Sequence, residues 1–74
     1  MELSKLKNGK RAVIRSVGGL DTRVQLLELG LVPGVPVRMI QGGNRDPLLV
    51  EVLGSTVVLG RSLARSILIQ HTAV

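Results

Sequence analysis

Few residues of this chain have the types and spacing that catalysis requires. The only imidazole is His71, which lies close to the carboxyl end, where a solvated or weakly ordered side chain is expected. The serines lack the Gly-x-Ser-x-Gly pattern that positions a nucleophile, and the chain has no cysteine. We therefore predict that the protein is not an enzyme, and no cofactor is expected.

The acidic residues are dispersed along the chain and form no paired carboxylates and no metal-ligand spacing such as His-x-x-x-His. A direct ferrous iron carrier would need hard oxygen ligands, for example Asp46 with Glu51. The plainer interpretation of Asp46, which precedes Pro47, is a turn-forming residue. The sequence leaves metal ligands unknown.

The glycine-rich segments do not match phosphate-binding motifs. Residues 30–34 lack the Gly-x-x-x-x-Gly-Lys-Ser/Thr order, and Gly18-Gly19 has no third glycine at the dinucleotide-binding spacing. The sequence gives no support for nucleotide binding.

The chain is strongly basic, with a formal net charge of +5 and a pI near 11.3. Such a charge favours binding to nucleic acid, to anionic lipid or to an acidic protein surface. It has no aromatic residue on which bases could stack, so no specific nucleic-acid partner is expected. The basic residues form either a patch where the first and last strands meet or a solvated rim: Lys5, Lys7, Lys10, Arg11, Arg15, Arg61 and Arg65.

Short apolar segments alternate with glycine-containing turns at the spacing of a small all-β barrel. We predict a single domain over residues 1–74 that is mainly β, with about five strands and one short inserted α-helix. The amino terminus has no apolar signal-peptide region and no segment is long and apolar enough to span a bilayer, so a cytoplasmic location is expected. The expected strands cover residues 10–17, 35–40, 48–53, 56–59 and 66–70, with a short turn or helix at 61–65.

The inserted helix is expected after Gly18-Gly19 and should span about two turns. Asp21 or Thr22 is the expected N-cap, and Thr22 followed by Gln25 matches a capping box. Gly30 suits the left-handed conformation that ends many helices.

The leucines of this helix exceed what one core needs, because a helix packed on a sheet requires an apolar stripe only somewhat over ~100° wide. On a helical wheel Val24, Leu27 and Leu31 lie on one side, and Leu26 and Leu29 lie toward the other. One interpretation assigns all of them to the core. The other, which we adopt as the prediction, is a partner-binding surface formed by Leu26, Leu29, Gly30, Leu31, Pro33 and Gly34.

The order of several motifs resembles the FeoA family over nearly the whole chain. These motifs are Leu3-Ser4-x-Leu6-Lys7-x-Gly9, Ala12-Val13-Ile14, Leu27-x-Leu29-Gly30-Leu31-Val32-Pro33-Gly34, Asp46-Pro47 and Ala64-x-x-Ile67. The resemblance implies an SH3-like barrel and a cytoplasmic, non-enzymatic accessory protein of bacterial ferrous iron uptake. It also implies a partner, the membrane iron permease that carries a GTP-binding domain.

The chain departs from the family pattern at two places. Arg45 replaces the glycine that commonly precedes Asp-Pro, and Leu63 stands where the family often has glutamate, so any role of that glutamate does not carry over. The same barrel also occurs in iron-dependent repressors, which leaves an alternative: an SH3-like module of an iron-dependent regulator, or a basic nucleic-acid-associated protein. The sequence is compatible with a homo-oligomer and with a position close to the membrane surface, and it does not decide either.

Overall fold

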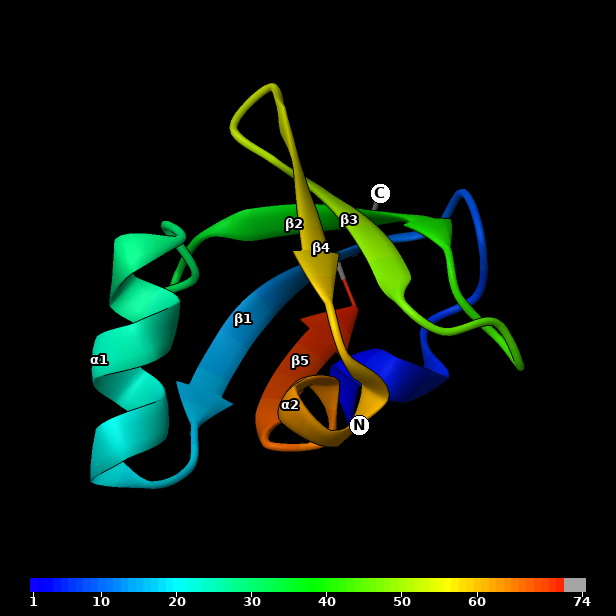
Figure 1. The fold of residues 1–74 in the computed structure, drawn as a ribbon. Helices are drawn as coiled ribbons and strands as arrows, with labels where there is room; N and C mark the ends of the chain where they lie inside the picture. Colours follow the sequence, from blue (N-terminus) through cyan, green and yellow to red (C-terminus); the bar gives the residue numbers. More distant parts are fainter. Residues whose placement is uncertain (72–74) are drawn as a thin grey trace.

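The computed structural model describes residues 1–71; residues 72–74, the last three of the expected domain, lie outside the described part. Five strands form one antiparallel sheet in the order β4-β3-β2-β1-β5 (Figure 1). The mainly-β prediction with one short inserted helix is confirmed. The strands are β1 (Arg11–Val17), β2 (Pro36–Gln41), β3 (Leu48–Val52), β4 (Ser55–Leu59) and β5 (Ile67–His71).

The sheet curls around a single aliphatic core. Its register shifts between Ile14 and Ser16 in the β1–β5 pair and between Met39 and Gln41 in the β2–β3 pair, and such bulges bend a sheet. Inward-facing residues alternate along the strands except at these bulges, and side chains from all five strands meet in the core. The buried strand residues are Ala12, Ile14, Val17, Val37, Met39, Leu48, Val50, Val52, Leu59, Ile67 and Ile69.

The amino-terminal segment lies against β5, an arrangement that the sequence did not predict. It contains a 3₁₀ turn, η1 (Leu3–Lys5), and buries Leu3 and Leu6. Glu2 forms an isolated bridge with Leu68, and the backbone N–H of Ile69 donates to the carbonyl oxygen of Met1 at 2.7 Å. A three-residue turn has no periodic pattern by which sequence reasoning can find it.

The inserted helix, α1 (Leu20–Glu28), stands beside the sheet between β1 and β2 (Figure 1). Gly19 is its N-cap, with a φ of 79° and no side-chain cap bond, so the expected capping box is wrong. The helix starts directly after the glycine pair, which places Thr22 inside its first turn rather than at the extended position that a cap requires.

The end of α1 follows the prediction for Gly30, whose φ of 81° is left-handed. The N–H of Gly30 donates to the carbonyl of Leu27 at 3.0 Å, and the N–H of Leu31 donates to that of Leu26 at 2.9 Å. These two bonds define a Schellman motif, in which the residue after the glycine is drawn back onto the last turn. Leu31 and Leu26 are accordingly both buried in the core.

The loop between β2 and β3 is fastened to the second helix, α2 (Arg61–Ala64). The N-cap of α2, Gly60, has no side chain to offer, and Oδ1 of Asp46 accepts the N–H of Arg61 at 3.1 Å instead. The guanidinium of Arg61 in turn donates to the carbonyl oxygens of Gly43 and, at 2.9 Å, Arg45. Asp46 therefore serves as a cap contributed from a distant loop.

Candidate functional site

The acids proposed as iron ligands are engaged in structural contacts. Asp46 accepts the bond from Arg61, and Oε1 of Glu51 pairs with Nε of Arg38 at 3.1 Å. Residues 1–71 contain no group of three or more His, Cys, Asp and Glu side chains placed to hold a metal ion. His71 is the last residue of β5, where it is exposed and paired with Ala12 of β1.

Two residues of the predicted partner-binding set are not on the surface. Leu26 is 0% exposed and Leu31 is 1% exposed, so both are core residues, and the prediction of an accessible surface is wrong for them. The physical reasons differ, because Leu26 lies within α1 on a side turned away from the exposed Val24 and Leu27, whereas Leu31 lies beyond the helix. α1 ends at Glu28, so the helical wheel does not extend to Leu31, whose direction is set by the Schellman turn.

The other members of that set remain accessible to different degrees. Leu29 is 40% exposed, Pro33 and Gly34 are exposed, and Gly30 is half-buried. The N–H of Gly34 donates to the carbonyl of Ile14 at 2.7 Å, which ties this turn to β1. The loop after α1 thus offers Leu29 and Pro33 on a backbone that is held in place.

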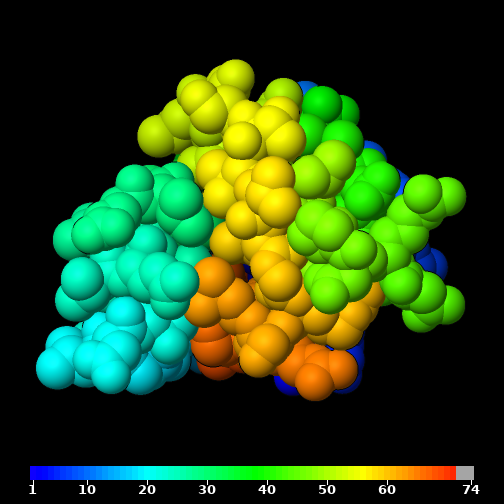
Figure 2. All heavy atoms as spheres, viewed as in Figure 1, coloured from blue at the N-terminus to red at the C-terminus, as the bar shows by residue number. Residues whose placement is uncertain are grey.

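The outward stripe of α1 is the surface that the prediction missed. Leu20, Val24 and Leu27 are 76%, 56% and 62% exposed, and their spacing of four and three residues places them on one side of the helix. Figure 2 shows α1 as a lobe at the left edge of the molecule, packed against the rest of the chain on one side. The sequence contains the information needed to find this stripe, because a helical wheel places Val24 and Leu27 on the same side of the helix.

An apolar groove adjoins this stripe, between α1 and the loop that follows it. Its volume is about 310 Å³, and it is lined by Val17, Arg23, Leu27, Leu31, Val32 and Pro33. The Nε of Arg23 donates to the carbonyl of Val17 at 3.1 Å, which fixes the one charged group of the lining. We call the stripe and the groove together the α1 face. Such a surface can bury a partner's apolar side chains.

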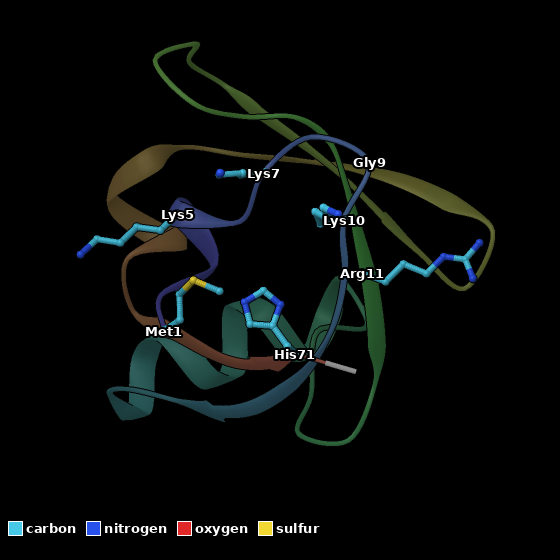
Figure 3. Close-up of a pocket in the computed structure, with 7 residues that line it drawn as sticks. All are labelled: Met1, Lys5, Lys7, Gly9, Lys10, Arg11 and His71. Atoms are coloured by element: carbon cyan, nitrogen blue, oxygen red, sulfur yellow. The ribbon is translucent and has the colours of Figure 1, made fainter. Parts of the chain in front are cut away.

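A second concavity lies where the amino-terminal segment meets β1 and β5 (Figure 3). Four of the basic residues predicted to gather where the first and last strands meet do line it: Lys5, Lys7, Lys10 and Arg11. The structure does not bring Arg15, Arg61 or Arg65 into this lining.

Within residues 1–71, neither α1 nor α2 has the length and apolar character that crossing a membrane requires. The curled five-stranded sheet, the inserted helix and the exposed α1 face define a small SH3-like barrel domain. A family model described as the FeoA domain matches residues 1–71. The chain belongs to the FeoA family, whose members are accessory proteins linked to ferrous iron transport.

Solved structures with the same fold include FeoA proteins. FeoA of Stenotrophomonas maltophilia, described as complexed with zinc and as a prokaryotic SH3 domain protein, is 36% identical, with a TM-score of 0.84; the match covers 95% of this chain and 89% of that one. An iron uptake regulatory protein, also described as FeoA, is 23% identical, with a TM-score of 0.91 and 97% coverage of both chains. The second likeness shows the fold alone.

The barrel also matches part of a longer regulator. A manganese-dependent transcriptional repressor is 15% identical with a TM-score of 0.88, and the match covers 97% of this chain and 41% of the repressor. At this identity the likeness shows the fold and not a shared role. No curated protein matches the chain.

Proposed function

We propose that this protein is a non-enzymatic accessory factor of bacterial ferrous iron uptake that docks on the cytoplasmic, GTP-binding portion of the membrane iron permease and modulates it. The single observation that carries the proposal is the exposed α1 face on a member of the FeoA family.

The energetics of the α1 face favour binding. Leu20, Val24 and Leu27 leave most of their apolar surface in water, and fully burying side chains of this kind is worth about 1.5–3 kcal/mol each. The adjoining groove supplies a recess for an apolar anchor from the partner, the arrangement found at the energetic centre of many interfaces. Stripe and groove meet at Leu27, which belongs to both.

The barrel does not depend on this outer stripe. Within α1 only Leu26 is buried, so substitutions at Val24 and Leu27 remove no buried side chain. A loss of binding in such variants therefore reports on the surface and not on the fold.

The decisive experiment compares two double variants with the same change in charge. Val24→Glu with Leu27→Glu alters the α1 face, whereas Leu53→Glu with Val58→Glu alters two comparably exposed apolar residues of the β3–β4 hairpin. Binding to the permease's soluble GTP-binding domain is measured by calorimetry, with and without guanine nucleotide, after circular dichroism has verified folding.

We expect the α1 variant to bind at least about 100-fold more weakly, because two anchor residues are lost, and the hairpin variant to bind within about twofold of the original protein. Undiminished binding by a folded α1 variant would remove this face from the mechanism. Equal weakening of both variants would indicate an effect of charge alone.

A regulatory module is the second candidate, because the same barrel forms part of a longer transcriptional repressor. It is tested by titrating the protein with duplex DNA at physiological salt. Nanomolar affinity for a defined sequence would favour this candidate over an accessory role in transport.

A further inference from the structure

The basic concavity is built by contacts between segments that lie far apart in the sequence. Lys5 belongs to η1, Lys7 and Lys10 to the connection that leads into β1, and His71 to the end of β5. The pairing of Ala12 with His71 and the bridge from Glu2 to Leu68 bring these segments together. The resulting space is about 780 Å³, and it shares no lining residue with the groove beside α1.

This one concavity accounts for most of the charge imbalance of the protein. Four of the ten lysines and arginines line it and no acidic residue does; the other six basic residues nearly balance the five acids. The one ion pair among the described residues joins Arg38 to Glu51, so the four cations of the concavity are not neutralised by a carboxylate there. Clustered unpaired cations in a recess concentrate positive potential.

Figure 3 shows how the side chains are arranged around the recess. Met1 and His71 lie near its centre, and Lys7 and Lys10 extend from the segment that borders it. Lys5 and Arg11 extend outward on opposite sides. Lys7 and Lys10 are therefore the residues to test.

We propose that this basic concavity binds a phosphate-bearing anion, supplied either by the headgroup of an anionic lipid or by a soluble phosphorylated small molecule. Lysine commonly binds phosphate as a point charge, and the volume lies in the range of about 300–1,000 Å³ that is usual for small-molecule sites. A nucleic acid fits less well, because the chain has no aromatic side chain on which bases can stack.

The test again uses two double variants with equal formal charge. Lys7→Gln with Lys10→Gln removes two cations from the concavity, and Arg15→Gln with Arg65→Gln removes two exposed cations that do not line it. Circular dichroism and thermal unfolding establish that both variants fold. The probes are vesicles of phosphatidylglycerol in phosphatidylcholine, assayed by co-sedimentation, and inorganic pyrophosphate, assayed by the amide resonances of Gly9 and His71.

We expect the concavity variant to lose at least about tenfold in affinity for one of these probes, because each lysine near bound phosphate contributes a charge-assisted contact. The matched variant should stay within about twofold. The probe that binds identifies the source: vesicles indicate a lipid headgroup, and pyrophosphate indicates a soluble ligand.

Three results would overturn the proposal. The first is binding to neither probe by the original protein. The second is equal weakening in both variants, which would reduce the effect to net charge. The third is tighter binding of a random-sequence DNA duplex through Lys7 and Lys10 than of either probe. The docking proposal for the α1 face is independent, because the two surfaces have no residue in common.

Discussion

The inward and outward sides of the α1 region present the same residue types to opposite environments. Leu26 is fully buried, whereas its neighbour Leu27 is mostly exposed, and the barrel core below is built from the same aliphatic side chains. Leu26 and Leu27 face different ways because successive helical residues are rotated by roughly 100°, and past the end of the helix Gly30 directs Leu31 inward. Core packing and surface exposure are thus assigned to different leucines of one short segment.

The largest expected effect is that of Leu26→Ala. Truncation of this buried leucine should lower the free energy of unfolding by about 2–5 kcal/mol, because the side chain leaves a cavity between α1 and the barrel. Urea unfolding followed by circular dichroism measures the loss. A loss below about 1 kcal/mol would mean that α1 is not anchored through this residue.

Gly30→Ala should have an intermediate effect, a loss of about 1–2 kcal/mol in the free energy of unfolding, because alanine is strained at the φ of 81°. A Cβ at this position meets no atom within 4 Å, so the loss is conformational rather than steric. Gly30→Asn is the control, since asparagine tolerates the left-handed region and should recover part of the stability. Equal losses for the two variants in the same urea assay would contradict this explanation.

The smallest expected effect on stability is that of Leu27→Gln, which should change the free energy of unfolding by no more than about 0.5 kcal/mol, because the side chain is already mostly in water. The same variant should nevertheless weaken binding to the permease domain. Thermal unfolding and calorimetry on one preparation measure both quantities, and a large loss of stability would erase the distinction between the two sides of α1.

The order of the elements could be predicted from the sequence because each element carries local signals. The apolar segments around Val13, Met39 and Val50 became strands close to the expected boundaries, and Gly30 ended the helix as expected. The assignment failed for Leu26 because the other side of the helical wheel, with Val24 and Leu27, is the one that faces water, and it failed for Leu31 because this residue lies past the end of the helix. The position of the helix end was predicted, but the side of the helix that faces the core was not.

The basic concavity required information that no local pattern contains. Its lining depends on the pairing of β1 with β5 and on the bridge between Glu2 and Leu68, contacts between residues almost a full chain length apart. The sequence indicated that basic residues gather near the first and last strands. It did not indicate that Arg15 and Arg65 would be left out.

The single buried leucine of α1 also has an evolutionary consequence. Because the residues of the outer stripe are not buried, their side chains can change with little effect on the core that sets the shape of the barrel. Structures only 15–36% identical to this chain superimpose with TM-scores of 0.84–0.91. A scaffold of this kind tolerates surface changes with little penalty in stability, and the same fold occurs both in a FeoA protein that this chain covers to 89% and as part of a longer transcriptional repressor.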